Sequence, residues 1–159
     1  MIHFTKEYCD NIINHFSKNH LVEKFEANDR KYKRFIIHQN NEEYKYLWND
    51  IDLLIKNNFG NNHYLSIWII VLKYDIGDYF LPHIDRYNQD DDRYISGGIE
   101  LSNEDDFKGG EFVVKNIKIP FERGKLITHK LTEIHEIKPI ISGTRWSLHF
   151  GINKSKKII

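Results

Sequence analysis

Apolar residues in the N-terminal third of the chain recur at helical spacing. Thr5 is suited to cap a helix that ends near residues 18–19, and the apolar side chains of that helix fall near one face at Tyr8, Ile12, Ile13 and Phe16. A second stripe, followed by Gly60, predicts a helix over about residues 41–57 and consists of Tyr44, Leu47, Trp48, Ile51, Leu54 and Ile55. We expect both stripes to pack against a sheet and to have no part in chemistry.

From about residue 63 the pattern changes to short segments rich in β-branched and aromatic residues, separated by turn residues such as Gly77-Asp78. The predicted strands are 64–74, 79–85, 94–101, 111–115, 117–119, 125–129, 134–140 and 144–152. Several short strands at regular spacing favour an antiparallel sandwich or barrel. The fold class is therefore expected to be mainly β with flanking helices.

The length of 159 residues predicts one domain. We expect residues 1–60 to form a helical buttress, 61–153 the β core and 154–159 a basic, solvated tail. The segment 86–93 is too hydrophilic to be buried, so it is predicted to be a loop at the mouth of any site that residues 83 and 85 line. Its acidic run, Asp90-Asp91-Asp92, could favour a basic partner or simply be solvated.

Composition and charge exclude several classes of protein. Cys9 is the only cysteine, so no internal disulfide is possible, and the N-terminus lacks the apolar core of a secretion signal, which favours a cytoplasmic location. The apolar run 65–72 is far shorter than the roughly 20 residues of a membrane helix. Lys and Arg total 23, as do Asp and Glu, so no global field favours nucleic acid.

Candidate chemistry begins with His83 and Asp85. On an extended strand their side chains share one face, about 6–7 Å apart along the backbone, where an imidazole and a carboxylate would converge on one point. A divalent metal needs a third ligand, for which His135 is best placed, with His129 and His149 as rivals. Two histidines and one carboxylate on one face of an ion are typical of non-haem Fe(II) oxygenases.

The C-terminal strands supply a second candidate group. A turn at Ser142-Gly143 would pair 144–152 with 134–140 in an antiparallel hairpin. Alternation then places Arg145, Ser147 and His149 on the face that points inward, with Trp146, Leu148 and Phe150 in the core. A buried arginine requires an anionic partner, and a guanidinium binds a carboxylate through paired hydrogen bonds, so a dicarboxylate cofactor would suit it.

The residues quoted so far form a pattern of known type. The segments YDIGDYFLPHID, IELSNEDDFKGGEFVV and HEIKPIISGTRWSLHF resemble, in order, the 2-oxoglutarate and Fe(II)-dependent oxygenases, specifically the prolyl-hydroxylase-like branch. The resemblance implies a double-stranded β-helix, or jelly roll, with the N-terminal helices on its larger sheet. It also implies that His83, Asp85 and His135 bind Fe(II), that Arg145 binds the distal carboxylate of 2-oxoglutarate, and that Tyr74 lines the same pocket. Gly109-Gly110 would be a structural turn.

One position departs from the family pattern, and two others distinguish among branches of the superfamily. Glu100 stands where relatives often carry an aromatic residue that faces the pocket. Many prolyl 4-hydroxylases have lysine at the position of Arg145, so arginine indicates the bacterial-type and oxygen-sensing-type relatives. Gly151 stands where a nucleic-acid demethylase of the superfamily would have a second arginine, which argues against base repair.

The resemblance implies a dioxygenase that uses Fe(II), 2-oxoglutarate and O2 to hydroxylate a peptide or protein side chain, with proline the leading candidate. The same chemistry on a free amino acid or another small molecule is the first alternative. A jelly-roll module that binds metal or a partner without oxidation is the second, although such a module has no use for Arg145. Mn, Co or Ni would fit the same ligands, and the oligomeric state stays open.

Overall fold

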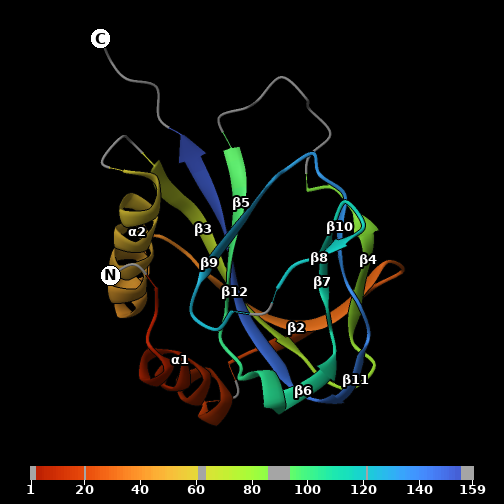
Figure 1. The fold of residues 1–159 in the computed structure, drawn as a ribbon. Coiled ribbons are helices and arrows are strands. Elements are labelled where there is room, and N and C mark those ends of the chain that lie inside the picture. Colours follow the sequence, from red (N-terminus) through yellow and green to blue (C-terminus); the bar gives the residue numbers. More distant parts are fainter. Residues whose placement is uncertain (1–2, 20, 61–63, 86–93, 121, 155–159) are drawn as a thin grey trace.

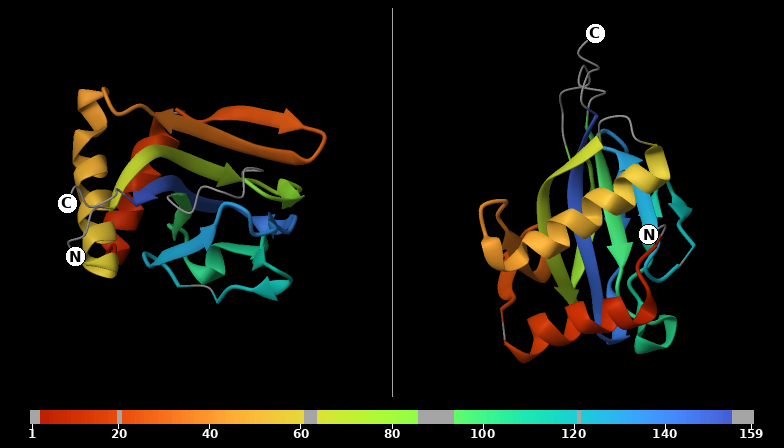
Figure 2. Two further views of the ribbon diagram at one scale, coloured as in Figure 1. Left: turned by 90° about the horizontal axis from the view of Figure 1, so that it is seen from above. Right: turned by 90° about the vertical axis from the view of Figure 1, so that its left-hand side faces the viewer.

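In the computed structural model, which describes residues 3–19, 21–60, 64–85, 94–120 and 122–154, two helices cover one face of a curled antiparallel sheet (Figures 1 and 2). The helices are α1 (Lys6–Lys18), the short 3-10 turns η1 (Glu42–Tyr44) and η2 (Glu104–Asp106), and α2 (Lys45–Phe59). The first strands are β1 (Glu23–Ala27), β2 (Arg30–Ile37), β3 (Tyr64–Tyr74), β4 (Tyr79–His83), β5 (Tyr94–Glu100) and β6 (Phe107–Gly109). The others are β7 (Phe112–Val114), β8 (Ile117–Lys118), β9 (Leu126–Lys130), β10 (His135–Ile137), β11 (Ile140–Gly143) and β12 (Arg145–Lys154).

Both predicted helices are present. Thr5 caps α1 by accepting a hydrogen bond from the backbone N–H of Tyr8, and α2 ends at Gly60, whose φ of 81° suits glycine. Their apolar stripes meet β3, β5 and β12 in one large core, as the pattern predicted. Figure 2 shows that the helices and the strands β4, β7 and β10 lie on opposite sides of β3 and β12. The helices therefore lie away from the face that carries His83.

The sheet has the strand order β8-β7-β10-β4-β2-β3-β12-β5-β9, with β1 paired to β2, and β6 and β11 form a separate pair. Because the long sheet curls, β4, β7 and β10 come to lie opposite β5, β9 and β12 (Figure 1). This arrangement agrees with the expected jelly roll, with the helices on the larger sheet. A second, smaller apolar cluster lies around Tyr32, Leu72, Tyr74 and Ile140.

The expectation of a wholly helical buttress is wrong for residues 23–37. These residues form the hairpin β1–β2, and β2 pairs with both β3 and β4, so it joins the two halves of the sheet. The strand pattern is hidden in the sequence because most β1 side chains are exposed and charged, and Lys and Arg alternate with aromatic residues in β2. Pairing with distant strands, which no local pattern reports, decides the conformation.

The predicted C-terminal hairpin is also wrong, although the inward parity of its residues is right. The strand β12 pairs with β3 and β5, whereas β10 pairs with β4 and β7, and β11 pairs with β6. Pro139 has no N–H to continue the β10 ladder. Gly143 has a φ of 76°, and a Cβ added there would clash with the carbonyl oxygen of Asp106. Only glycine therefore fits where the chain passes from β11, in the small sheet with β6, to β12 in the long sheet.

The predicted loop 86–93 lies outside the described residues, as does the predicted tail from residue 155 onward, whereas Lys154 ends β12. Among the described residues, no helix combines the length and the apolar character needed to span a bilayer.

Tight packing at the centre of the sheet gives a stability prediction. A Cβ added at Gly97 would lie 2.5 Å from a ring carbon of Phe150, which is fully buried. A Cβ added at neighbouring Gly98 would meet only the carbonyl oxygen of Leu148, at 3.4 Å. We expect Gly97→Ala to lower the free energy of unfolding by about 1–3 kcal/mol through overpacking, and Gly98→Ala to change it by far less. Urea unfolding of the two variants checks this, and equal losses would contradict it.

Candidate active site

His83 and His135 are brought together by the pairing of β4 with β10, in which they lie directly opposite each other. Their ring centroids are 4.1 Å apart. The ring of His83 also stacks on Phe80, with centroids 3.5 Å apart and planes at 7°, and the guanidinium carbon of Arg30 lies 4.2 Å from the Phe80 centroid. These contacts fix the orientation of the His83 ring.

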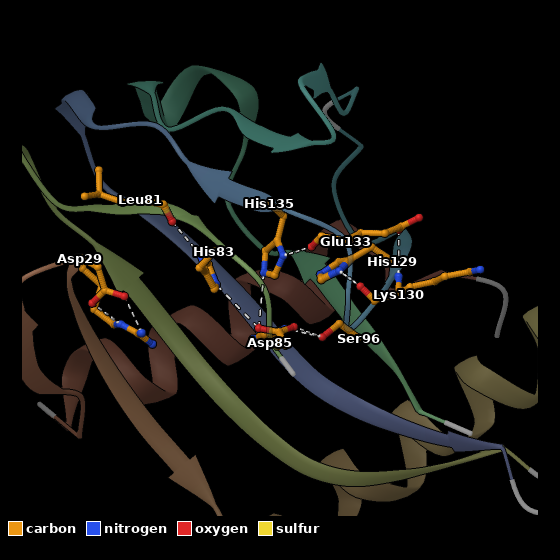
Figure 3. Close-up of polar contacts among 11 residues, drawn as sticks. Asp29, Leu81, His83, Asp85, Ser96, His129, Lys130, Glu133 and His135 are labelled. Atoms are coloured by element: carbon orange, nitrogen blue, oxygen red, sulfur yellow. Dashed lines mark hydrogen bonds and ion pairs between the residues drawn. The ribbon is translucent and has the colours of Figure 1, made fainter. Parts of the chain in front are cut away.

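Backbone carbonyls select the tautomer of both histidines. His83 Nδ1 lies 2.8 Å from the carbonyl oxygen of Leu81, and His135 Nδ1 lies 2.9 Å from that of Glu133 (Figure 3). A carbonyl can only accept, so Nδ1 carries the proton in each ring and Nε2 is the nitrogen available to a metal. Both Nε2 atoms point toward Asp85, at 3.7 Å and 3.5 Å from its Oδ1.

Asp85 follows the end of β4, and two contacts fix it there. Its backbone N–H donates to the carbonyl of Leu131 at 2.9 Å, and its Oδ2 accepts a hydrogen bond from the Ser96 hydroxyl at 2.5 Å. One ligand atom from each of His83, Asp85 and His135 lies within 4.8 Å of the others. Two imidazole nitrogens and one carboxylate oxygen are donors that suit a divalent first-row transition metal, so this set fits such an ion.

The charges of the three groups also suit a metal. Burial lowers the pKa of His83 to about 4, so that ring is neutral at neutral pH. Burial raises the pKa of the Asp85 carboxyl, but its interactions with His135, His149 and Ser96 outweigh burial and hold the pKa below its usual range. For His135, burial opposes protonation, yet the hydrogen bonds to Asp85 and to the Glu133 carbonyl raise its pKa. A metal would compete for Nε2 of His135 with the proton that Asp85 favours there.

A pocket between the two halves of the curled sheet connects His83 and His135 to Arg145 and Tyr74, and all four residues line it. Arg145 is 7% exposed, and its Nε donates to Oε2 of Glu100 at 2.7 Å. Its Nη1 is buried without a hydrogen-bond partner among the described residues. Tyr74 is buried, its ring lies 5.7 Å from the Arg145 guanidinium carbon, and burial raises the pKa of its hydroxyl. An acceptor such as a carboxylate would satisfy the unpaired Nη1.

The partner of Arg145 was not predicted from the sequence. Glu100, at the end of β5, is 5% exposed, and its Oε1 is also buried without a hydrogen-bond partner among the described residues. Burial raises the pKa of the Glu100 carboxyl despite the nearby guanidinium. The pocket therefore places a carboxyl group beside the arginine that is expected to bind a second one.

Sequence reasoning also missed Ser96. The signal was present, because Ser96 shares the strand parity of Gly98 and Glu100, which line the pocket, and its hydroxyl contacts Asp85. The two rival histidines, His129 on β9 and His149 on β12, lie close to the same carboxylate. The structure thus brings together all the candidate ligands that the sequence indicated.

A family model described as the 2OG-Fe(II) oxygenase superfamily matches residues 69–152, more than half of the chain. The chain belongs to this superfamily. A PKHD-type hydroxylase from Methylobacterium nodulans is 30% identical over 95 residues, which cover 49% of this chain and 39% of that protein. The match thus spans well under half the length of that hydroxylase.

Solved structures support the fold. The viral collagen prolyl hydroxylase of Paramecium Bursaria Chlorella virus-1, in a 2OG complex, has a TM-score of 0.70 at 21% identity, with 96% of this chain and 92% of that chain covered. A Pseudomonas putida prolyl-4-hydroxylase has a TM-score of 0.71 at 17% identity, with 98% and 90% covered. At these identities the similarity shows the jelly-roll fold of a superfamily that uses Fe(II) and 2-oxoglutarate.

Proposed function

We propose that residues 1–159 form one oxygenase domain that uses Fe(II), 2-oxoglutarate and O2 to hydroxylate a peptide or protein side chain, with proline the leading candidate. The observation that carries the proposal is the buried Nη1 of Arg145, which has no hydrogen-bond partner among the described residues and whose side chain lines the same pocket as the candidate metal ligands His83 and His135. A module that binds only a metal has no use for that guanidinium. Superfamily membership and the prolyl hydroxylases among its structural relatives support the choice of substrate class.

In this proposal His83, Asp85 and His135 hold the metal, and Arg145 binds the distal carboxylate of 2-oxoglutarate with Tyr74 beside it. The metal and the co-substrate together supply the oxidation of a substrate C–H bond by O2. The protein positions them: the Leu81 and Glu133 carbonyls hold Nδ1–H of the two histidines, and the Ser96 hydroxyl orients Asp85. Apolar walls that include Leu72, Phe80 and Ile127 limit water in the pocket.

The test combines a binding measurement with a product measurement. Anaerobic addition of Fe(II) and 2-oxoglutarate should produce a visible metal-to-ligand charge-transfer band. After exposure to O2, a synthetic proline-rich peptide should gain an oxygen atom by mass spectrometry, and an alanine-for-proline peptide should not. A band with oxidation only of free amino acids or other small molecules would favour the small-molecule alternative. Absence of the band would overturn the oxygenase proposal and favour a non-catalytic module.

The Glu100–Arg145 pair gives a prediction for co-substrate affinity. Bound 2-oxoglutarate would bring a carboxylate next to the Glu100 carboxyl. Removal of a nearby like charge in a buried site changes the binding free energy by more than the roughly 1.4 kcal/mol that corresponds to a tenfold change in affinity. We therefore expect Glu100→Gln to tighten 2-oxoglutarate binding by about tenfold or more, measured by titration of the charge-transfer band. Glu43→Gln, which alters an exposed side chain beside α2, is the control. Weaker binding by Glu100→Gln would contradict the prediction.

A further inference from the structure

Asp85 is shared by two sets of possible metal ligands. Besides His83 and His135, the pair His129 and His149 offers ring nitrogens that lie with an Asp85 oxygen within 4.8 Å of one another. His129 is 8% exposed, and its ring centroid is 4.1 Å from that of His135. The strand β5, which carries Ser96, lies between β9 and β12, the strands that carry His129 and His149.

The ring of His129 is held in the same way as the rings of the two proposed iron ligands. Its Nδ1 lies 3.1 Å from the carbonyl oxygen of Lys130, so Nδ1 carries the proton and Nε2 keeps its lone pair (Figure 3). A buried imidazole N–H needs an acceptor, and here the carbonyl meets that need at Nδ1 and leaves Nε2 free on the side of Asp85 and His135. The backbone has therefore selected the metal-binding tautomer at a third histidine next to Asp85.

His149 turns Nε2 toward the Ser96 hydroxyl that contacts Asp85. Its Nε2 lies 3.3 Å from the Ser96 hydroxyl oxygen, whose single proton is donated to Oδ2 of Asp85. A neutral His149 ring donates this contact from Nε2, so a metal bound at that nitrogen would have to displace its proton. The ring packs edge-on against Trp68, with centroids 5.0 Å apart, which limits its rotation.

The two oxygens of Asp85 have different neighbours. Oδ1 faces Nε2 of His83 and of His135, whereas Oδ2 accepts from Ser96 on the strand next to His129 and His149. A carboxylate can bind one cation through each oxygen, which is how a single Asp can serve two metals.

We propose that Asp85, His129 and His149 form a second subsite for a divalent transition-metal ion, next to the His83, Asp85 and His135 set and sharing its carboxylate. Two imidazoles and one carboxylate favour ions such as Co, Ni, Zn or Fe over Mg or Ca. The second ion binds more weakly than the first, because the carboxylate is shared and two dications this close repel each other.

Cobalt(II) is a suitable probe, because it binds the same donor atoms and reports its coordination by visible absorption. Equilibrium dialysis of the whole chain against excess Co(II), followed by metal analysis, should give about two ions per chain, bound in two steps. His129→Phe, which keeps a buried aromatic ring, should bind about one ion and lose the weaker step. His149→Leu, a variant on a different strand, should likewise bind about one ion and lose the weaker step. Far-UV circular dichroism and retention of the tight step would show that each variant is folded.

His83→Ala separates this inference from the proposed function. That variant should lose the tight step and keep the weaker one, so the two sites can fail independently. A wild-type chain that binds a single Co(II), or a His129→Phe variant that still binds two, would overturn the second subsite. Neither outcome would affect the assignment of the first set.

Discussion

Arg145→Leu is expected to lower the free energy of unfolding by about 3–5 kcal/mol and to abolish 2-oxoglutarate binding at concentrations that saturate the wild type. Arg145 and Glu100 are 7% and 5% exposed and are joined by a 2.7 Å hydrogen bond, so the substitution leaves a buried carboxyl group without its cation. Urea unfolding of the protein without metal or co-substrate measures the first effect. Titration of the charge-transfer band measures the second.

The double variant Glu100→Leu/Arg145→Leu is the matched control. Replacement of both members of a buried ion pair by apolar groups is often neutral or stabilising by about 1–4 kcal/mol, so the double variant should recover the stability that Arg145→Leu loses. It should not recover 2-oxoglutarate binding, because the guanidinium is absent. If the double variant were as unstable as Arg145→Leu, packing around the arginine rather than its charge would be the cause.

Asp85→Ala is expected to remove tight Fe(II) binding and with it all hydroxylation. The substitution deletes the only carboxylate of the proposed ligand set and leaves His83 and His135, which hold a divalent metal poorly on their own. Anaerobic Fe(II) titration with and without 2-oxoglutarate measures the loss. Because Asp85 also belongs to the second ligand set, Co(II) binding should fall at both steps.

Ser96→Ala is the graded counterpart of Asp85→Ala. It keeps all the ligands and removes the 2.5 Å hydrogen bond that orients the carboxylate, together with the 3.3 Å contact of the Ser96 hydroxyl with His149. Loss of such a supporting contact costs about 10–100-fold in metal affinity. Ser96→Ala should therefore bind Fe(II) more weakly than the wild type by that factor, whereas Asp85→Ala should lose tight binding altogether. Wild-type affinity in Asp85→Ala would show that another residue supplies the anionic ligand.

The elements that the sequence predicted best are those whose pattern is local. The apolar stripes of α1 and α2, and the alternation that turns Arg145, Ser147 and His149 toward the pocket, follow from the helical and strand periods alone. The spacing of His83 and Asp85 likewise needs only a strand and the bend after it. In each case the information is carried by residues within a few positions of one another.

The pairings that the sequence did not predict are not local. The partners of β12 are β3 and β5, which lie far earlier in the chain, and the hairpin β1–β2 joins the sheet through β3 and β4. The pairing of Glu100 with Arg145 depends on the register of β5 against β12, in which Ser147 lies opposite Glu100. Register is a tertiary property, and no periodicity within either strand specifies it.

The unequal lengths of the strands that carry the site determine how the protein opens. Arg145 lies on the ten-residue strand β12, whereas His83 and His135 lie on strands of five and three residues. Local opening of short strands requires less free energy, so we expect amide hydrogens of β4 and β10 to exchange with solvent sooner than those of β12. A metal held by His83 and His135 would link the two short strands and slow the exchange of their amide hydrogens. The ion would then stabilise the structure as well as take part in the reaction.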